Sequence, residues 1–266
     1  MYRAFVTALR TLTILRVPGS DAASFHCSLP FFPLVGALLG GMVWAVGSGM
    51  VVGIGGSIEI AAFFCVGIST VLTGGIHLDG LADSADGLLC MASRERRLEI
   101  MKDSTVGTYG ALAIVFAVLL KWICYGVLLG STVHYLIVVV FVISRTVQVE
   151  LATSCNSARD GKGTGGVFIE GAGTKQRVLA WAISLLITGW MGPVALLLLP
   201  IGFVGARIMA AFFTRKVGGV TGDLLGASGE MTEALLLFIS SAVVQTLDSR
   251  WGAEWLASPT VNFFLS

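Results

Sequence analysis

The chain has 266 residues, a net charge of +1, 55% hydrophobic residues and only 12% charged residues. Its mean hydropathy of +0.87, together with a charged fraction far below the roughly 25% of soluble domains, excludes an ordinary soluble protein. The composition is that of a protein embedded in a lipid bilayer, and we expect no nucleic-acid partner.

The first predicted element covers residues 1–18. Arg3, Arg10 and Arg16 interrupt its apolar residues and no small-residue cleavage site follows, so the segment is not a signal peptide. We expect an amphipathic helix that lies on the cytoplasmic membrane surface and ends at Pro18-Gly19.

Apolar windows long enough to cross a bilayer follow along the chain. About 20 residues are needed to span roughly 30 Å of hydrocarbon, and five windows approach that length, at 31–52, 58–76, 108–129, 133–152 and 231–245. The run 178–213 has room for two crossings with a turn at 189–193, although its first limb is short and could be re-entrant. We therefore expect an all-α polytopic membrane bundle of six or seven helices.

Charged residues are confined to alternate connections between these windows. Lys and Arg precede the first window, follow the second and fourth, and precede the last, whereas the connections 53–57, 130–132 and 189–193 carry no charge. By the positive-inside rule the charged loops face the cytoplasm. The carboxyl terminus then lies outside with seven spans and inside with six. Residues 1–250 form one membrane domain, and 251–266 form a tail.

The segment 74–87 reads G-G-I-H-L-D-G-L-A-D-S-A-D-G and precedes the first charged loop. If it is helical, its spacing places Asp79, Asp83 and Asp86 on one face. No Lys or Arg occurs from 77 to 93 to neutralise them. Mg2+ is bound by carboxylate oxygens, waters and substrate phosphates, so this face predicts a magnesium site. His77 is better treated as a base or orienting residue, because Mg2+ prefers oxygen.

The loop 93–110 contains Lys102, Asp103 and Ser104 just before a predicted transmembrane helix. Asp103 or Ser104 could be a helix cap, but a Lys-Asp pair beside a Gly-rich turn could also hold a phosphate and its metal. The arginines at 94, 96 and 97 could instead rest on anionic lipid.

Two further charged loops, 155–173 and 215–230, are rich in glycine. Arg159 and Lys162 add positive charge to a backbone that could approach phosphates, although no Walker pattern is present and a plain linker would look similar. Asp223 in the second loop could complete the metal site, or it could start a helix.

Charged residues also fall inside the apolar windows, where an ionised group costs at least about 2.5–3.5 kcal/mol and is usually paired or faces a cavity. Lys121, Arg145, Glu150 and Arg207 are of this kind. Arg145 and Glu150 lie loosely on one helical face, so a pair between them is left open. The spacing of Gly36 and Gly40 indicates close helix packing.

Three motifs together resemble one enzyme family. They are T-G-G-I-H-L-D-G-L-A-D-S-A-D-G from Thr73, I-M-K-D-S-T-V-G-T-Y-G from Ile100 and G-G-V-T-G-D-L-L-G-A from Gly218. In this order they are similar to the adenosylcobinamide-GDP ribazoletransferases, the cobalamin synthases of vitamin B12 assembly. The resemblance runs from about residue 5 to about residue 240, with an inexact match in the loop 156–166.

The resemblance implies a membrane-bound, Mg2+-dependent transferase of the inner membrane, with its active site facing the cytoplasm. It would join adenosylcobinamide-GDP to alpha-ribazole or alpha-ribazole 5'-phosphate and release GMP, a phosphoryl transfer that depends on positioning and charge neutralisation. As a hypothesis, Mg2+ is held by Asp79, Asp83, Asp86 and Asp223, the catalytic residues are His77, Asp83, Lys102 and Asp103, and the substrate or its phosphates contact Lys102, Ser104, Arg145, Arg159 and Gly222.

Two other interpretations remain open. CDP-alcohol phosphotransferases also place D-G-x-x-A at a membrane face with Mg2+, but here Asp83 follows the alanine where that family has Arg. An ion-coupled transporter would explain charges inside the spans, but it predicts carboxylates near the bilayer midplane. Besides the lipid bilayer, a second copy of the chain and other late cobalamin-pathway enzymes are candidate partners.

Overall fold

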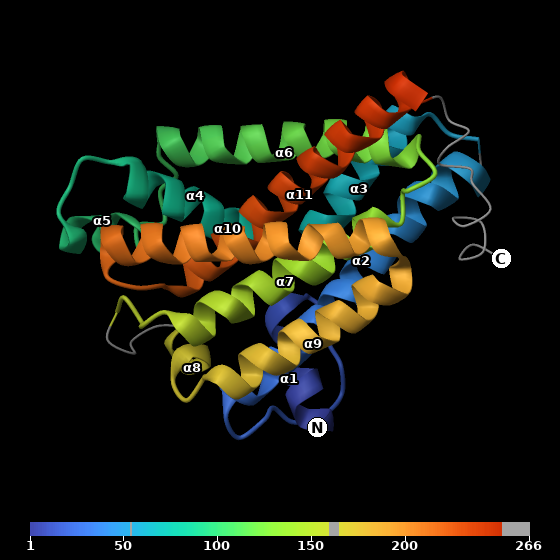
Figure 1. The fold of residues 1–266 in the computed structure, drawn as a ribbon. Coiled ribbons are helices and arrows are strands. Elements are labelled where there is room, and N and C mark those ends of the chain that lie inside the picture. The colour runs from blue at the N-terminus through green and yellow to red at the C-terminus, as the bar shows by residue number, and fades with distance from the viewer. Residues whose placement is uncertain (54, 160–164, 252–266) are drawn as a thin grey trace.

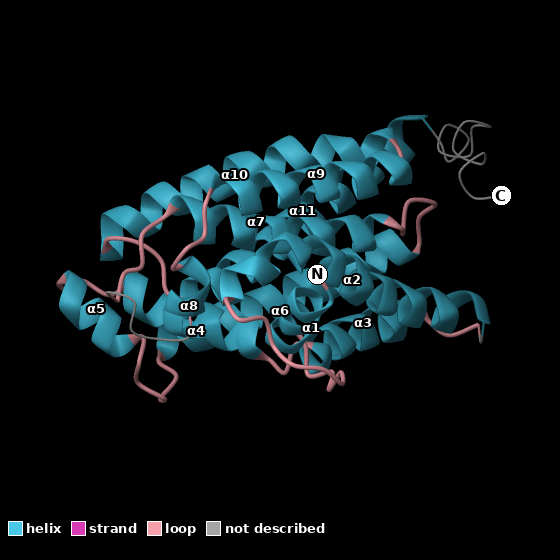
Figure 2. Ribbon diagram, turned by 90° about the horizontal axis from the view of Figure 1, so that it is seen from below, coloured by secondary structure: helices cyan, strands magenta, loops and turns pink. Residues whose placement is uncertain are grey.

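The computed structural model describes residues 1–53, 55–159 and 165–251. Within these ranges all regular structure is helical, and one isolated β-bridge, between Ser157 and Val220, joins two loops. The helices are α1 (Tyr2–Leu12), η1 (Phe25–Phe31), α2 (Phe32–Ser48), η2 (Gly49–Gly53), α3 (Ile58–Leu72), α4 (Ile76–Leu89), α5 (Arg94–Ile100), α6 (Thr108–Leu129), α7 (Leu136–Ser154), α8 (Gly166–Ile169), α9 (Thr174–Met191), α10 (Pro193–Val217) and α11 (Gly222–Trp251). Figures 1 and 2 show them as one elongated bundle, which confirms the predicted all-α fold.

Helix α7 lies at the centre of the bundle, with α2, α9, α10 and α11 packed around it. Its apolar stretch is 94% buried inside the protein. The approach of α2 is very close, because a Cβ on Gly36 would lie 2.5 Å from the carbonyl oxygen of Phe141 and one on Gly40 would lie 2.8 Å from the Cα of Val138. The predicted packing role of these two glycines is confirmed.

Five continuous helical stretches are long and apolar enough to cross a membrane. They are Phe25–Gly53, which includes α2, then α6, α7, α10, and Gly222–Thr246 within α11. Helices α3 and α4 pass the same test only together, and they are bent by 87°. The bend falls at Gly74 and Gly75, whose φ angles of 62° and 72° are left-handed and suit glycine. The described residues thus offer five or six spans, in line with the lower of the two predicted counts.

The apolar run 178–213 forms the hairpin of α9 and α10, turned at Gly192 with a φ of 115°. The predicted turn is therefore confirmed. Helix α9 begins with polar residues and does not by itself count among the candidate spans, so a seventh crossing finds no support in the described part of the chain.

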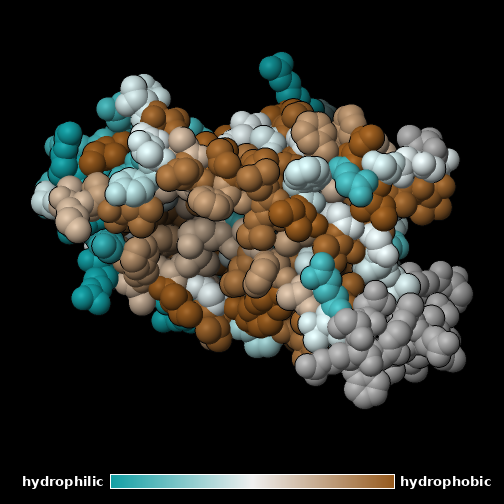
Figure 3. All heavy atoms as spheres, turned by 90° about the horizontal axis from the view of Figure 1, so that it is seen from above, coloured by the Kyte–Doolittle hydropathy of each residue, from teal (hydrophilic) through white to brown (hydrophobic). Residues whose placement is uncertain are grey.

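The charged connections gather at one end of the bundle. In Figure 1, α5, α8 and the α10–α11 connection lie at the left, whereas the connections α2–α3, α6–α7 and α9–α10 lie at the right. Figure 3 shows apolar side chains across the middle of one face and hydrophilic ones mainly toward the left end. The grouping expected from charge is therefore present for these loops, whereas α1, which carries Arg3 and Arg10, lies nearer the middle of the bundle (Figures 1 and 2). The side of the membrane that each end faces stays a prediction.

Several element boundaries differ from the expected ones. Helix α11 starts at Gly222, so the expected loop 215–230 is reduced to a short turn. Helix α1 ends at Leu12, well before Pro18, which therefore does not terminate it. The apolar side of α1, including Ala8 and Leu9, is buried and packs against η1 and α2, so much of that side contacts protein.

Charged residues inside the bundle are paired across helices. Lys121 Nζ of α6 lies 2.7 Å from an oxygen of Glu230 and 2.5 Å from one of Glu233, both in α11. Arg145 Nη1 of α7 lies 2.9 Å from the other oxygen of Glu233. We call these four residues, Lys121, Arg145, Glu230 and Glu233, the Lys121 network. Since an ion in hydrocarbon is tolerated when it is paired, the network provides partners for two of the predicted intramembrane charges, Lys121 and Arg145.

Arg145 and Glu150 do not pair with each other, and each has other partners. Residues five apart on a helix diverge by roughly 140°, and Glu150 points away from Arg145. Its carboxylate accepts a hydrogen bond of 2.9 Å from the Trp181 indole and pairs with Arg207 at 3.3 Å. Both remaining intramembrane charges are thereby accounted for.

Candidate active site

The predicted carboxylate motif is helical, and it is held against the first turns of α11. A Cβ on Gly80 would lie 2.6 Å from the carbonyl oxygen of Asp223, so the glycine between Asp79 and Asp83 permits a very close helix contact. On the other helix, Gly226 lies against the backbone of His77. These contacts bring the aspartates of α4 and Asp223 together at the charged-loop end.

A pairing of two loops places a cation beside these carboxylates. Two backbone hydrogen bonds of 2.9 Å join the segment 156–158 to Val220, just before α11. The pairing positions Arg159, whose Nη2 lies 3.0 Å from Oδ2 of Asp223. The Thr221 hydroxyl also donates to this oxygen at 3.3 Å. Arg159 and Asp223, predicted from two separate loops, therefore belong to one site, whereas Lys162 lies outside the described residues.

Asp83 is the carboxylate whose pKa responds to the charges of the whole group. Helix α4 follows the sharp bend after α3 and carries its three carboxylates toward the charged-loop end, so we place Asp83 outside the apolar part of the bent α3–α4 pair. Partial burial, then the charges of Asp79 and Asp223, raise the pKa of the Asp83 carboxyl to about 6, although Arg159 acts in the opposite direction. A carboxylate surrounded by like charges is stabilised in its ionised form by a nearby cation.

Asp86 lies on the same helix but contacts the start of α6. Its two oxygens accept backbone hydrogen bonds from Gly107 at 2.7 Å and from Gly110 at 2.9 Å. This is the helix-capping role that sequence reasoning missed, because its partners lie more than 20 positions further along the chain. A metal-binding role for Asp86 stays a prediction.

Arg97 holds the other end of α4. Its guanidinium is buried and donates to the carbonyl oxygens of Leu88 at 2.5 Å and Gly87 at 3.2 Å, groups left without partners at the end of a helix. The contact with lipid that was one alternative for this arginine is therefore wrong, since the side chain faces protein.

Lys102, Asp103 and Ser104 lie in an exposed turn between α5 and α6. The Asp103 carboxylate accepts hydrogen bonds from the hydroxyl of Thr105 at 2.7 Å and its amide at 3.0 Å, which lower its pKa. A link to the site is the weak hydrogen bond of 3.4 Å from Arg159 to the carbonyl oxygen of Met101. The turn thus adjoins the aspartate group, and its catalytic roles stay predictions.

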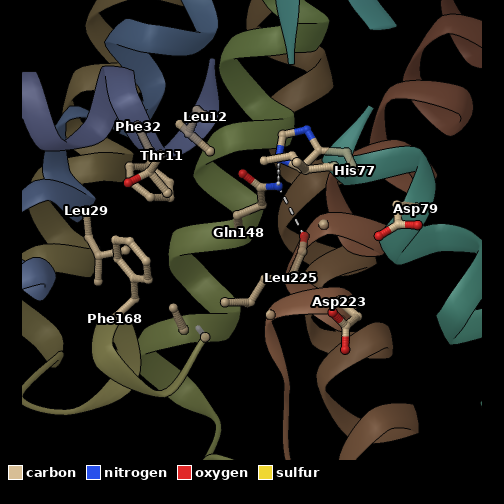
Figure 4. A pocket seen from close by; sticks show the side chains of 15 residues that line it. Thr11, Leu12, Leu29, Phe32, His77, Asp79, Gln148, Phe168, Asp223 and Leu225 are labelled. Atoms are coloured by element: carbon tan, nitrogen blue, oxygen red, sulfur yellow. Dashed lines mark hydrogen bonds between the residues drawn. The ribbon is translucent and has the colours of Figure 1, made fainter. Parts of the chain in front are cut away.

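A cavity of about 360 Å³ opens beside Asp79 and Asp223 (Figure 4). His77 lines it, and Gln148 of α7 lies between this imidazole and α11: the Gln148 amide nitrogen donates to the Leu225 carbonyl at 3.1 Å and lies 3.3 Å from Nε2 of His77. The predicted residue Gly222 also lines the cavity. Gln148 gave no signal in the sequence beyond being polar within an apolar window.

Arg145 does not join this group of aspartates. Its side chain is fully buried and bound to Glu233, and it is absent from the residues that line the cavity. The structure therefore places this predicted phosphate ligand in the Lys121 network, with a visible structural role.

The carboxylates fit a magnesium ion that is shared with a phosphate substrate. Among the described residues, no three His, Cys, Asp or Glu side chains converge to hold a metal by themselves. Mg2+ usually takes one or two carboxylates and completes its shell with water and substrate phosphates. Asp79, Asp83 and Asp223 supply oxygen donors of this kind, and the raised pKa of Asp83 reflects partial burial and then crowded negative charge, which a cation would offset.

Comparison with known proteins identifies the family. The profile of the cobalamin-5-phosphate synthases matches residues 4–241. The chain is 42% identical over 248 residues to the adenosylcobinamide-GDP ribazoletransferase of Chlorobium chlorochromatii. The matched region covers 92% of this chain and 97% of that protein. Identity to the enzyme of the same name is 43% in Prosthecochloris aestuarii (89% and 96% covered) and 36% in Geotalea daltonii (91% and 98% covered). No solved structure matches. The chain therefore belongs to the cobalamin-5-phosphate synthase family of enzymes, as its three motifs indicate.

Proposed function

We propose that the chain transfers the phosphocobinamide group of adenosylcobinamide-GDP to alpha-ribazole or its 5'-phosphate. A ribose hydroxyl attacks the phosphorus on the cobinamide side, the bond to the GMP oxygen breaks, and the products are adenosylcobalamin or its phosphate and GMP. The observation that carries this proposal is the meeting of Asp79, Asp83 and Asp223 with Arg159 beside a cavity. The names of the relatives support the choice of substrates.

The residues divide into groups that bind metal, phosphate and the attacking hydroxyl. Asp83, with Asp79 or Asp223, would hold Mg2+, which supplies charge neutralisation of the diphosphate. Arg159 and the amino-terminal amides of α11 are suited to phosphate oxygens, because a helix amino terminus favours anions. His77 is the candidate for accepting the proton of the hydroxyl, since it lines the cavity and is oriented by Gln148.

We also propose that this end of the bundle faces the cytoplasm at the inner membrane. Basic residues gather in its loops, which is the pattern of cytoplasmic loops. The bent α3–α4 pair is a feature that the transporter interpretation shares. Its aspartates, however, lie toward the charged-loop end, and family membership favours the enzyme over a transporter or a lipid phosphotransferase.

The decisive experiment is turnover by the purified protein in nanodiscs. Adenosylcobinamide-GDP, alpha-ribazole and Mg2+ should yield a cobalamin and an equal amount of GMP, both separated by chromatography. A chelator should stop the reaction and added Mg2+ should restore it, while Asp83→Asn serves as the inactive control. Failure of a folded protein to form cobalamin would overturn the proposed function, and turnover in chelator would overturn the role of Mg2+.

A further inference from the structure

We propose that the cavity beside Asp79 and Asp223 binds the aromatic base of the acceptor, the dimethylbenzimidazole of alpha-ribazole. This inference rests on the proposed function and names the substrate group that the cavity takes. It also assigns the two substrates to different places, because the cobinamide and GMP groups of the donor then bind outside the cavity.

The cavity has two chemically different sides. Figure 4 shows the side chains of α1, η1, α2 and α8 on one side, and those of α4, α7 and α11 on the other. The first side presents Leu12, Leu29 and Phe32, which are at most 6% exposed. Phe168 of α8 completes it, and its ring is held edge-to-face against Phe32 and Phe25, with centroids 6.1 and 5.3 Å apart. This side is a fixed apolar surface.

The apolar side selects against guanine. Among the described residues, Thr11 is the polar side chain lining this part of the cavity, and its hydroxyl already donates to the Thr7 carbonyl at 2.7 Å. The amide and amino groups of guanine would be desolvated there without partners, which is unfavourable. Dimethylbenzimidazole has two methyl groups and no exocyclic polar group, so its faces and its methylated edge match the apolar surface.

Size separates the base from the corrin. A volume of about 360 Å³ lies at the lower end of the roughly 300–1,000 Å³ of pockets that enclose drug-sized ligands. A bicyclic base with its ribose is a ligand of that class, whereas a corrin with its amide side chains and adenosyl group is several times larger.

The polar side then fits the ribose. Asp79, Asp223 and His77 line the cavity opposite the apolar residues, and the two carboxylates can accept hydrogen bonds from sugar hydroxyls. A base packed against Leu29 and Phe168 thus directs its ribose toward Asp223 on the opposite side. Because Asp223 is paired with Arg159, the attacking hydroxyl is brought toward the expected phosphate-binding side chain.

Phe168 provides the test, because it lies in a short helix and is only partly buried. Phe168→Ala removes aromatic contact area, and we expect binding of alpha-ribazole to weaken and its KM to rise by about 10- to 100-fold. The KM for adenosylcobinamide-GDP should change by no more than about twofold, since that substrate makes no contact with the apolar side. Phe168→Leu should recover most of the affinity. Phe63→Ala, at an exposed ring of α3, is the matched control and should change neither KM.

Binding of alpha-ribazole alone, measured by calorimetry in nanodiscs, keeps this inference separate from the proposed function. If wild-type protein forms cobalamin while Phe168→Ala leaves the KM for alpha-ribazole unchanged, or raises that of adenosylcobinamide-GDP instead, the cavity assignment is wrong and the function stands. Competition between GMP and alpha-ribazole for the free protein would likewise contradict the assignment. If wild-type protein neither binds alpha-ribazole nor forms cobalamin, the proposed function itself fails.

Discussion

Arg159 Nη2 lies 3.0 Å from Oδ2 of Asp223, and this ion pair ties the loop after α7 to the first turn of α11. Arg159 is the cation that acts on Asp83, whereas three carboxylates, those of Asp79, Asp223 and Asp86, act on it in the opposite sense. One arginine therefore faces four carboxylates. This excess of negative charge supports the proposal that a divalent cation binds at the site, and it leads to the first prediction.

In metal-free protein, Asp83 should make stability depend on pH. Its pKa is raised from 3.8 to about 6, so the folded protein holds a proton that the unfolded chain releases. The resulting stabilisation is fully present below the unfolded value and is lost as the pH rises through about 6. Asp83→Asn cannot ionise. In chelator, it should therefore melt at a higher temperature than wild type near pH 7.5, and the difference should shrink as the pH falls through about 6 and vanish only below 3.8, as followed by thermal unfolding in detergent.

Addition of Mg2+ should reverse that order. A ligand that binds only the folded state raises its stability, so Mg2+ should raise the melting temperature of wild type and leave that of Asp83→Asn nearly unchanged. Below about pH 6, protons should compete with the metal and weaken this effect. An equal response of the two proteins to Mg2+ would remove Asp83 from the metal site.

Much of the architecture follows from local sequence. Runs of apolar residues locate the spans because bilayer thickness fixes their length, and the spacing of Gly36 and Gly40 predicted close helix packing, although not that α7 is the partner. The segment with the i, i+4, i+7 spacing of aspartates is helical, as α4 shows, while the metal-binding role expected for its carboxylates stays a prediction. These are properties of single helices, and a single helix is encoded by neighbouring residues.

The relations between helices were less predictable. The partners of Lys121 and Arg145 are Glu230 and Glu233, which lie far away in the chain. Their pairing depends on how α6, α7 and α11 pack. The caps made by Asp86 and Arg97 likewise depend on neighbouring helices. Side-chain charge alone could indicate that partners were needed, but it could not identify them.

Asp86 should behave as a structural residue. Asp86→Ala removes both acceptors from the start of α6, and loss of a helix cap costs about 0.5–2 kcal/mol. The variant should therefore be destabilised equally in Mg2+ and in chelator, as measured by thermal unfolding. If its loss of stability appears only with Mg2+, Asp86 is a metal ligand after all.

Gly80 should be sensitive to a single methyl group. In Gly80→Ala the new Cβ would lie 2.6 Å from the Asp223 carbonyl oxygen, so α4 and α11 must separate at the site. Overpacking of this kind costs about 1–3 kcal/mol, and activity should fall with stability because Asp83 and Asp223 move apart. Gly67→Ala in α3 is the control, since no atom lies within 4 Å of its Cβ position. Equal effects of the two substitutions would show that the close contact of α4 and α11 is unimportant.

The Lys121 network should contribute far more to stability than an exposed ion pair. Lys121→Met leaves Glu230 and Glu233 with Arg145 alone, and breaking a buried pair typically costs about 3–5 kcal/mol. Lys121→Met with Glu230→Gln restores charge balance, because Arg145 still neutralises Glu233, and it should recover much of the loss. Arg96→Met breaks the exposed pair with Glu99, for which about 0–1 kcal/mol is expected. Denaturant unfolding of the three variants in detergent compares them directly. A Lys121→Met variant no less stable than Arg96→Met, or a double variant less stable than Lys121→Met, would contradict a buried and mutually neutralising network.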